Sequence, residues 1–363
     1  KAIPYILRYN CASGIAANIL KQEMLSLGAD VAVSRGALTG KAKKTDCLLI
    51  GNLSQLQLLT QKLKLQPFGL DRLAVDLSRT LANYQRDRFV LDLGRYRLNL
   101  SRRTHIMGIV NLTPDSFSGD GLYGSQGIMD YVEGMVEDGA DIIDVGGESS
   151  RPGARPVAIK EELSRTIPVI KRLVRKIRVP VSIDTYKPEV AKAALDSGAS
   201  IVNDITGLRN PKMLKLLSKY KAGAVIMHML GSPRTMQRNP KYVSLIDEIL
   251  EYLRNAVNRA GACGIDKEKI IVDPGIGFGK SMEHNLQILN RLSDFKVLGR
   301  PILVGPSRKA FIGKILNEEP QNRLFGTVSA CVLAATLGAK IVRVHDVKAT
   351  KQALKVFDAV DKL

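Results

Sequence analysis

Polar and charged residues follow eight short apolar runs in this chain, and their types suit the binding of a phosphorylated aromatic ring. Arg and Lys side chains bind phosphate oxygens, and Arg can do so with two parallel hydrogen bonds. Carboxylates and a carboxamide complement the amino edge of a flat heterocycle, while Met and Phe pack on aromatic faces. The residues concerned are Arg151, Asp184, Asn203, Met227, Asp273, Phe278, Lys309, Arg343 and His345. They predict a ligand that combines an amino-heterocycle with phosphate.

The apolar runs that precede these residues are rich in Val and Ile, as expected for parallel strands that are buried on both faces. Amphipathic segments such as Lys187–Ser197 and Val243–Ala260 lie between the runs and are typical of helices. Eight such units indicate a (β/α)8 TIM barrel, in which the loops after the strands meet at one mouth. The predicted strands are His105–Val110, Asp141–Val145, Val179–Ile183, Ser200–Asp204, Gly223–Met227, Ile270–Asp273, Pro301–Gly305 and Lys340–Val344.

The first 87 residues do not follow this rhythm and indicate a small α/β domain of unknown role that precedes the barrel of residues 88–363. The candidate elements within it are helices over Gly14–Leu27 and Ser54–Leu63, a strand over Asp46–Gly51 and an apolar run at Leu73–Leu77. Residues Phe89–Leu100 alternate between apolar and polar, which predicts a hairpin that caps the bottom of the barrel.

Each polar group has an ordinary structural explanation when it is taken alone. Asp184 after a strand is equally consistent with a helix N-cap, and a single His345 is more often structural than catalytic. Gly275–Gly279 resembles a dinucleotide-binding turn, but its third glycine comes one residue too early. Eight polar strand ends that point at one mouth nevertheless favour a binding site over eight separate caps.

Five motifs at these strand ends resemble those of the dihydropteroate synthase family. They are Asn111–Phe117, Gly146–Gly153, Asp273–Lys280, Ser307–Lys309 and Arg343–Asp346. The resemblance runs from about Phe89 to the C-terminus. It implies the condensation of p-aminobenzoate with 6-hydroxymethyl-7,8-dihydropterin diphosphate, which gives 7,8-dihydropteroate and diphosphate in folate biosynthesis. The family also implies Mg2+ as cofactor and a homodimer formed by barrel helices.

The resemblance assigns a role to each matching position. Asp184, Asp273, Lys309 and Arg343 are the expected catalytic residues. The expected pterin site comprises Asp184, Asn203, Ile205, Met227, Asp273 and Lys309. The expected p-aminobenzoate site comprises Ser150, Pro152, Phe278, Ser307 and Lys309. The diphosphate is expected at Asn111, Arg151, Arg343 and His345, with Asn111 also a ligand of Mg2+.

This chain departs from the common family pattern in three places. Ser150 stands where relatives often have Thr, which keeps the hydroxyl group. The loop acid, taken as Asp120, comes one position later than in many members. The N-terminal domain is absent from the compact bacterial form. The implied mechanism has ionised Asp184 and Asp273 stabilise a pterin cation while Arg and metal stabilise the leaving diphosphate.

Composition limits the other possibilities. The chain has 363 residues and a net charge of +19, but it lacks an RNA-binding motif, a zinc finger or a basic stretch interleaved with aromatic residues. We therefore expect small-molecule substrates and no nucleic-acid or membrane partner. Four widely spaced cysteines and no evident signal peptide predict a reducing cytoplasmic setting. The rival functions are a pterin-dependent methyltransferase and a non-catalytic pterin-binding barrel.

Overall fold

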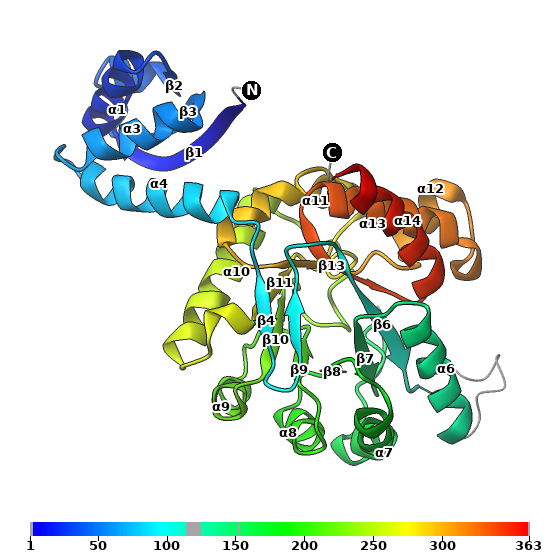
Figure 1. Cartoon of the computed structure of the whole chain (residues 1–363). Helices are drawn as coiled ribbons and strands as arrows, with labels where there is room; N and C mark the ends of the chain where they lie inside the picture. The colour runs from blue at the N-terminus through cyan, green and yellow to red at the C-terminus, as the bar shows by residue number, and fades with distance from the viewer. Residues whose placement is uncertain (1–2, 114–124, 152, 362–363) are drawn as a thin grey trace. The chain divides into compact units, whose positions relative to one another are not determined.

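The computed structural model describes residues 3–113, 125–151 and 153–361. Within it the chain divides into two compact units, Lys1–Gln85 and Arg86–Leu363. Figure 1 shows the N-terminal unit in blue to cyan and the second unit in cyan to red. No helix in the described part of the chain is both long and apolar enough to cross a membrane.

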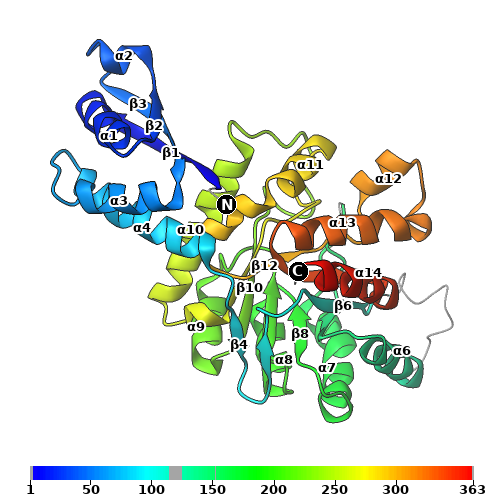
Figure 2. The same ribbon diagram turned by 45° about the horizontal axis from the view of Figure 1, so that its top comes forward.

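The N-terminal unit is a three-stranded antiparallel sheet with helices packed on one face (Figure 2). The strand order is β1-β3-β2, and side chains along β3 alternate between exposed and buried, as they do when one face of a sheet is covered. Leu20, Met24, Leu49 and Leu56 lie in its core. Its elements are β1 (Pro4–Ser13), α1 (Gly14–Ser26), β2 (Asp30–Val33), α2 (Arg35–Leu38), β3 (Lys44–Asn52), α3 (Leu53–Leu63) and α4 (Leu70–Gln85).

The second unit is a closed barrel of eight parallel strands, which confirms the predicted fold (Figure 1). The strands pair in chain order, and β13 pairs with β6 to close the barrel. Two of the eight predicted runs, Gly223–Met227 and Ile270–Asp273, coincide with the observed strands, and the other six differ by one or two residues at an end. The strands are β6 (His105–Asn111), β7 (Ile142–Gly146), β8 (Val181–Asp184), β9 (Ile201–Asp204), β10 (Gly223–Met227), β11 (Ile270–Asp273), β12 (Ile302–Val304) and β13 (Ala339–Val344).

Helices surround the barrel and pack on the outward-facing residues of its strands. Val202, Ile226, Val272 and Val342 belong to this outer layer of the core. Pro188 occupies the first turn of α8, where its missing N–H costs no hydrogen bond. The helices are α6 (Ser125–Glu137), α7 (Ile159–Lys176), α8 (Pro188–Asp196), α9 (Pro211–Tyr220), α10 (Leu245–Ala262), α11 (Met282–Asn290), α12 (Ala310–Leu316), α13 (Leu324–Thr336) and α14 (Val347–Val360).

A short hairpin closes one end of the barrel. Its strands are β4 (Val90–Asp92) and β5 (Arg97–Asn99), and they pair antiparallel. Phe89, Leu91 and Leu100 pack on the inward-facing residues at the start of the barrel strands, including Ile142 and Ile271. The predicted hairpin is therefore confirmed. With this end filled by apolar side chains, the polar strand ends meet at the opposite mouth.

Candidate active site

Strand pairing places the predicted polar residues at one level of the barrel mouth. Asn111 pairs with Gly146, Gly146 pairs with Asp184, and Asp184 pairs with Asn203 across four consecutive strands. On the next two strands, Met227 pairs with Asp273, two residues further along β10 than Val225, the partner of Asn203. Paired residues of parallel strands project to the same side of a sheet, so these side chains share the mouth.

The centre of the mouth is an ion network built around Arg343. Its Nε donates to Asp144 Oδ2 at 2.6 Å and its Nη2 donates to Asp184 Oδ2 at 2.7 Å. Asn203 Nδ2 donates to the same oxygen of Asp144 at 3.0 Å. Three predicted residues, Asp184, Asn203 and Arg343, are thus held together by a fourth that the sequence analysis did not single out.

Asp144 is not predicted as a site residue from the sequence because it lies within an apolar run that is typical of a buried strand. It is fully buried and comes two residues before Gly146, on the same inward face of β7. A charged residue inside a strand that is otherwise apolar was the signal that could have identified it, since charges are rarely fully buried without a partner.

Burial sets the ionisation of the acidic and basic groups here. Burial, together with the charges of Asp144, Glu162 and Asp204, raises the pKa of Asp184 to about 7, although Arg343 opposes the shift. Burial likewise raises the pKa of Asp273 to about 6. Burial and Arg343 lower the pKa of Lys309 to about 8, against the attraction of Asp273. At neutral pH the mouth can therefore hold both carboxylate and ammonium groups.

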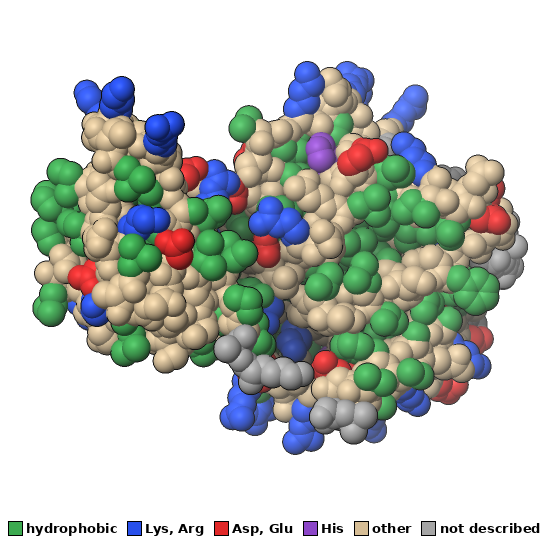
Figure 3. All heavy atoms as spheres, turned by 90° about the horizontal axis from the view of Figure 1, so that it is seen from above, with side chains coloured by type: hydrophobic (Ala, Val, Ile, Leu, Met, Phe, Trp, Pro, Cys, Tyr) green, Lys and Arg blue, Asp and Glu red, His purple; other side chains and the backbone are tan. Residues whose placement is uncertain are grey.

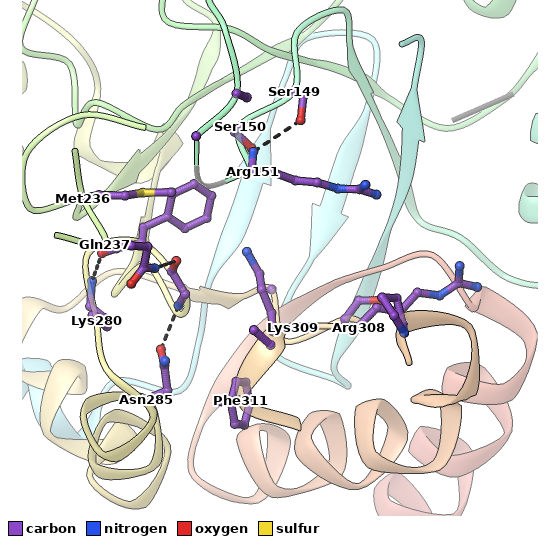
Figure 4. A pocket seen from close by; sticks show the side chains of 18 of the residues that line it. Ser149, Ser150, Arg151, Met236, Gln237, Lys280, Asn285, Arg308, Lys309 and Phe311 are labelled. Carbon is purple, nitrogen blue, oxygen red and sulfur yellow. Dashed lines mark hydrogen bonds between the residues drawn. The ribbon is translucent and has the colours of Figure 1, made fainter. Parts of the chain in front are cut away.

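A cavity of about 1600 Å³ opens at this mouth. Figure 4 shows Arg151 extending across it opposite Lys309 and Arg308. The predicted residues that line the cavity are Asn111, Ser150, Arg151, Phe278, Ser307, Lys309, Arg343 and His345. Asp184, Asn203, Ile205, Met227 and Asp273 are not among its lining residues. Asp184 instead contacts the lining residue Arg343, and Asn203 is joined to Arg343 through Asp144.

One wall of the site is apolar. Ile205, Met227 and Phe278 form a cluster with Met229 and Met236, against which Tyr186 packs. The ammonium group of Lys309 lies 4.2 Å from the centre of the Phe278 ring, within cation–π range. Three predicted ring-packing residues therefore come together from three different strand ends.

His345 lies on another wall and is neutral rather than cationic. Its Nδ1 shares a hydrogen bond of 2.9 Å with Ser307 Oγ, which also accepts from the His345 backbone N–H. Burial and the charges of Arg308 and Arg343 lower the pKa of His345 to about 3. The sequence predicts a cationic role for this side chain, which is wrong because burial keeps the imidazole neutral and burial cannot be inferred from a single residue. It can offer a hydrogen bond to phosphate but not a charge.

A buried ion cluster fixes the start of α8 to the segment that follows β7. Lys187 Nζ pairs with Glu148 and Glu162 and also donates to the carbonyl oxygen of Val157. The Val157 N–H donates to Glu148 at 3.0 Å, and Tyr186 OH donates to the other oxygen of that carboxylate. These contacts hold both ends of the segment that carries Ser150 and Arg151.

Two predicted site residues, Asp120 and Pro152, lie outside the described residues. The described part of the chain contains no group of three or more His, Cys, Asp or Glu side chains that could hold a metal ion. Asn111, the predicted metal ligand, is partly buried and lines the cavity. A single amide oxygen fits Mg2+, which usually keeps several waters and binds through one or two protein ligands plus substrate phosphates.

Comparison with known proteins agrees with this geometry. The family described as pterin binding enzyme matches residues 107–345. The dihydropteroate synthase of Synechocystis sp. is 47% identical over 273 residues, which cover 74% of this chain and 94% of that protein. This chain belongs to the dihydropteroate synthase family. The solved structure of the Xanthomonas albilineans dihydropteroate synthase with 4-aminobenzoic acid has a TM-score of 0.72 and 43% identity, covering 76% of this chain and 99% of that one.

The family relationship reaches into the N-terminal unit in some members. A probable bifunctional folylpolyglutamate synthase/dihydropteroate synthase of Haloferax volcanii is 39% identical over 350 residues, which cover 94% of this chain and 41% of that protein. An alignment of that length includes most of the N-terminal unit as well as the barrel.

Proposed function

We propose that this chain condenses 6-hydroxymethyl-7,8-dihydropterin diphosphate with p-aminobenzoate, giving 7,8-dihydropteroate and diphosphate. The observation that carries the proposal is the junction of Asp184, Asn203 and Arg343 at one barrel mouth, in a chain of the dihydropteroate synthase family. Carboxylates and an amide suit an amino-pterin edge, and a guanidinium suits the adjoining diphosphate. The activity is a transfer of an alkyl group other than methyl.

The pterin is proposed to bind at the inner end of the mouth. Asp184, Asn203 and Asp273 would accept from and donate to its ring nitrogens and amino group, while Met227 and Ile205 pack on its face. Lys309 would complete the edge contacts. To admit the ring, Arg343 would exchange one of its two carboxylate partners for oxygens of the diphosphate.

The diphosphate is proposed to lie against Asn111, Arg151, Arg343 and His345. Arg151 and Arg343 would neutralise its charge, while His345 would act as a neutral donor. Mg2+ bound at Asn111 would add positive charge that favours departure of the diphosphate. Electrostatic stabilisation of a leaving polyanion is typically a large part of catalysis in such reactions.

The p-aminobenzoate is proposed to occupy the outer part of the cavity. Ser150, Phe278, Ser307 and Lys309 line the cavity, and these residues and Pro152 are assigned to this subsite from the family pattern. Phe278 offers an aromatic face, and the two serines offer hydroxyl groups to a carboxylate. The apolar wall excludes water from the reacting carbon, which protects an electrophilic intermediate from hydrolysis.

The proposed reaction breaks the C–O bond between the pterin methylene carbon and the diphosphate. The bonding electron pair leaves with the diphosphate, and the pterin ring carries the positive charge. Ionised Asp184 and Asp273 stabilise that cation. The aniline nitrogen then forms the new C–N bond and releases its proton to solvent, so no strong base is required.

The deciding experiment is an assay for diphosphate release by the purified chain. We expect release that depends on both p-aminobenzoate and the pterin diphosphate, with 7,8-dihydropteroate detected by mass spectrometry. Incubation with methyltetrahydrofolate and a corrinoid protein tests the methyltransferase alternative in parallel. Tight pterin binding without product in the presence of Mg2+ would contradict the proposal and identify a binding protein.

A homodimer is also proposed, with barrel helices as its interface. Hydrophobic side chains gather on the face of the barrel unit where α11 to α14 lie (Figure 3). Ile315 on α12 is 55% exposed, and Phe325 and Leu333 on α13 are 81% and 46% exposed. Contiguous exposed apolar surface of this kind marks protein interfaces. Phe325→Asp should therefore shift the chain from dimer to monomer in analytical ultracentrifugation, and an unchanged mass would contradict this interface.

We further propose a cytoplasmic location. Cys47, Cys263 and Cys331 are free thiols in the described part of the chain. Free thiols persist in the reducing cytoplasm, whereas disulfides form in oxidising compartments.

A further inference from the structure

Lys280 is a buried cation whose hydrogen-bond partners are all uncharged. The residue directly precedes the N-cap of α11 and is 2% exposed. Its Nζ lies 3.0 Å from Nδ1 of His228, 2.9 Å from the carbonyl oxygen of Phe278 and 3.5 Å from the carbonyl oxygen of His228. These three acceptors match the three protons of an ammonium group. Burial of a charge that makes no hydrogen bond to a charged partner is costly, and such groups are often found at functional sites.

The ammonium group joins two segments that pass unusually close to one another. Gly275 has φ +73°, and a Cβ there would lie 1.9 Å from the carbonyl oxygen of His228. A Cβ on Gly279 would lie 2.7 Å from Cβ of Leu230. The turn after β11 therefore lies directly on the residues after β10, and Lys280 bonds to both. This turn carries Phe278, and β10 ends at Met227, so the contact sets the spacing of two proposed ring-packing residues.

Lys280 also contributes positive charge beside Asp273. The Gly275 N–H donates to the Asp273 carboxylate at 2.7 Å, and the positive charges of Lys309 at the N-cap of α12, Lys280 and Arg343 on β13 also act on this carboxylate. Each of these opposes the rise in the Asp273 pKa that burial causes. Burial lowers the pKa of Lys280 itself to about 7, against the attraction of Asp273 and with the repulsion of Lys309. His228 stays neutral, because burial and Lys280 lower its pKa to about 2.

We infer that Lys280 is a positioning residue of the mouth, which fixes the Gly275–Gly279 turn against the end of β10 and adds positive charge to the surroundings of Asp273. The inference rests on the proposed function, in which Asp273 stabilises the pterin cation. It gives two roles to one side chain, a hydrogen-bonding role toward Phe278 and an electrostatic role toward Asp273. The two roles can be separated by substitution.

The test compares Lys280→Met and Lys280→Gln with the wild-type chain and with Lys215→Met, which removes an exposed lysine from α9. We measure thermal unfolding and the pH dependence of kcat/KM for the pterin substrate. Lys280→Met should change the unfolding temperature little, because the removal of a buried charge offsets the loss of its three hydrogen bonds. In the pH profile of kcat/KM for this variant, the acidic limb should move up by about one pH unit, because Asp273 loses a neighbouring cation.

The two Lys280 variants should differ toward p-aminobenzoate. Lys280→Gln can still donate to the Phe278 carbonyl, so its KM for p-aminobenzoate should stay near the wild-type value. The acidic limb of its kcat/KM profile should move as in Lys280→Met, because both variants lose the charge. Lys280→Met should raise that KM by about tenfold, since a hydrogen bond of a charged donor is lost. At pH 6, kcat/KM for the pterin should fall about fivefold in both variants, and Lys215→Met should match wild type.

Two results would overturn the inference. One is a kcat/KM profile in which the acidic limb of both Lys280 variants coincides with that of the wild type. The other is a large drop in unfolding temperature with the same proportional loss of activity at every pH, which would assign Lys280 to fold stability alone. Should the wild-type chain form no dihydropteroate, the proposed function fails instead. Fluorescence titration of wild type and variants with 6-hydroxymethylpterin at pH 6 and pH 8 then still tests the charge on Asp273.

Discussion

The two units of this chain differ sharply in what they bury. In the described part of the N-terminal unit the buried polar side chains are those of Thr45 and Thr60, and the core is otherwise apolar. The barrel unit buries Asp144, Asp273 and Lys280 almost completely, all near one mouth. Buried charges cost stability, so a fold that retains several in one place does so for a reason other than stability. Catalysis is therefore assigned to the barrel unit, and substitutions in the two units should have different consequences.

The largest effect on catalysis is expected for Asp184→Asn. The substitution keeps the shape of the side chain but removes the charge that stabilises the pterin cation, so kcat should fall by at least about 100-fold. The fold should persist, because Arg343 keeps its bond to Asp144. Steady-state kinetics and circular dichroism of the variant provide the measurement.

A matched control for that variant is Asp196→Asn. Asp196 is an exposed carboxylate at the end of α8 that pairs with Lys192. Its substitution should leave kcat unchanged. Near-normal turnover in Asp184→Asn would refute a charge-stabilising role and would remove the main reason for locating catalysis at the Arg343 network.

A smaller effect is expected for Arg151→Met at the outer part of the cavity. Arg151 is exposed and extends across the cavity, so its bond to diphosphate would form in contact with solvent (Figure 4). The KM for the pterin diphosphate should rise about tenfold with kcat within about threefold, because a charge-assisted hydrogen bond is lost. The salt dependence of kcat/KM should also weaken. Equal loss of kcat and of kcat/KM would instead indicate that Arg151 acts mainly in the transition state.

The barrel was predictable from sequence because its strands are buried on both faces and read as continuous apolar runs. Val225 and Ile226 face opposite sides of β10, yet both are fully buried and apolar. The same property concealed Asp144, since a strand read as uniformly apolar gives no indication of which face points inward. The inward face became evident only when pairing placed Asp144, Gly146 and Asp184 around the same mouth.

The N-terminal unit was less predictable for a related reason. Its sheet is covered on one face, so β1 mixes exposed Ile6 with partly buried Leu7 and has no continuous apolar run. The strands at Pro4–Ser13 and Asp30–Val33 are not predicted from the sequence, and Leu73–Leu77, predicted as an apolar run of no assigned type, lies within helix α4. Antiparallel pairing of distant segments, such as Tyr5 with Gly51, leaves little local signal.

The smallest effect on catalysis is expected for Leu20→Ala in the N-terminal unit. Leu20 is fully buried in a core composed of residues before Arg86, so the cavity left behind should cost about 2–5 kcal/mol of stability. The site residues proposed here all lie in the barrel unit, so kcat and both KM values at 25 °C should match those of wild type. Leu253→Ala, at a fully buried position of the barrel core, is the matched substitution and should reduce the amount of active enzyme on heating. Loss of kcat in Leu20→Ala at a temperature where its barrel remains folded would show that the N-terminal unit takes part in catalysis, and the contrast between the two units would then be wrong.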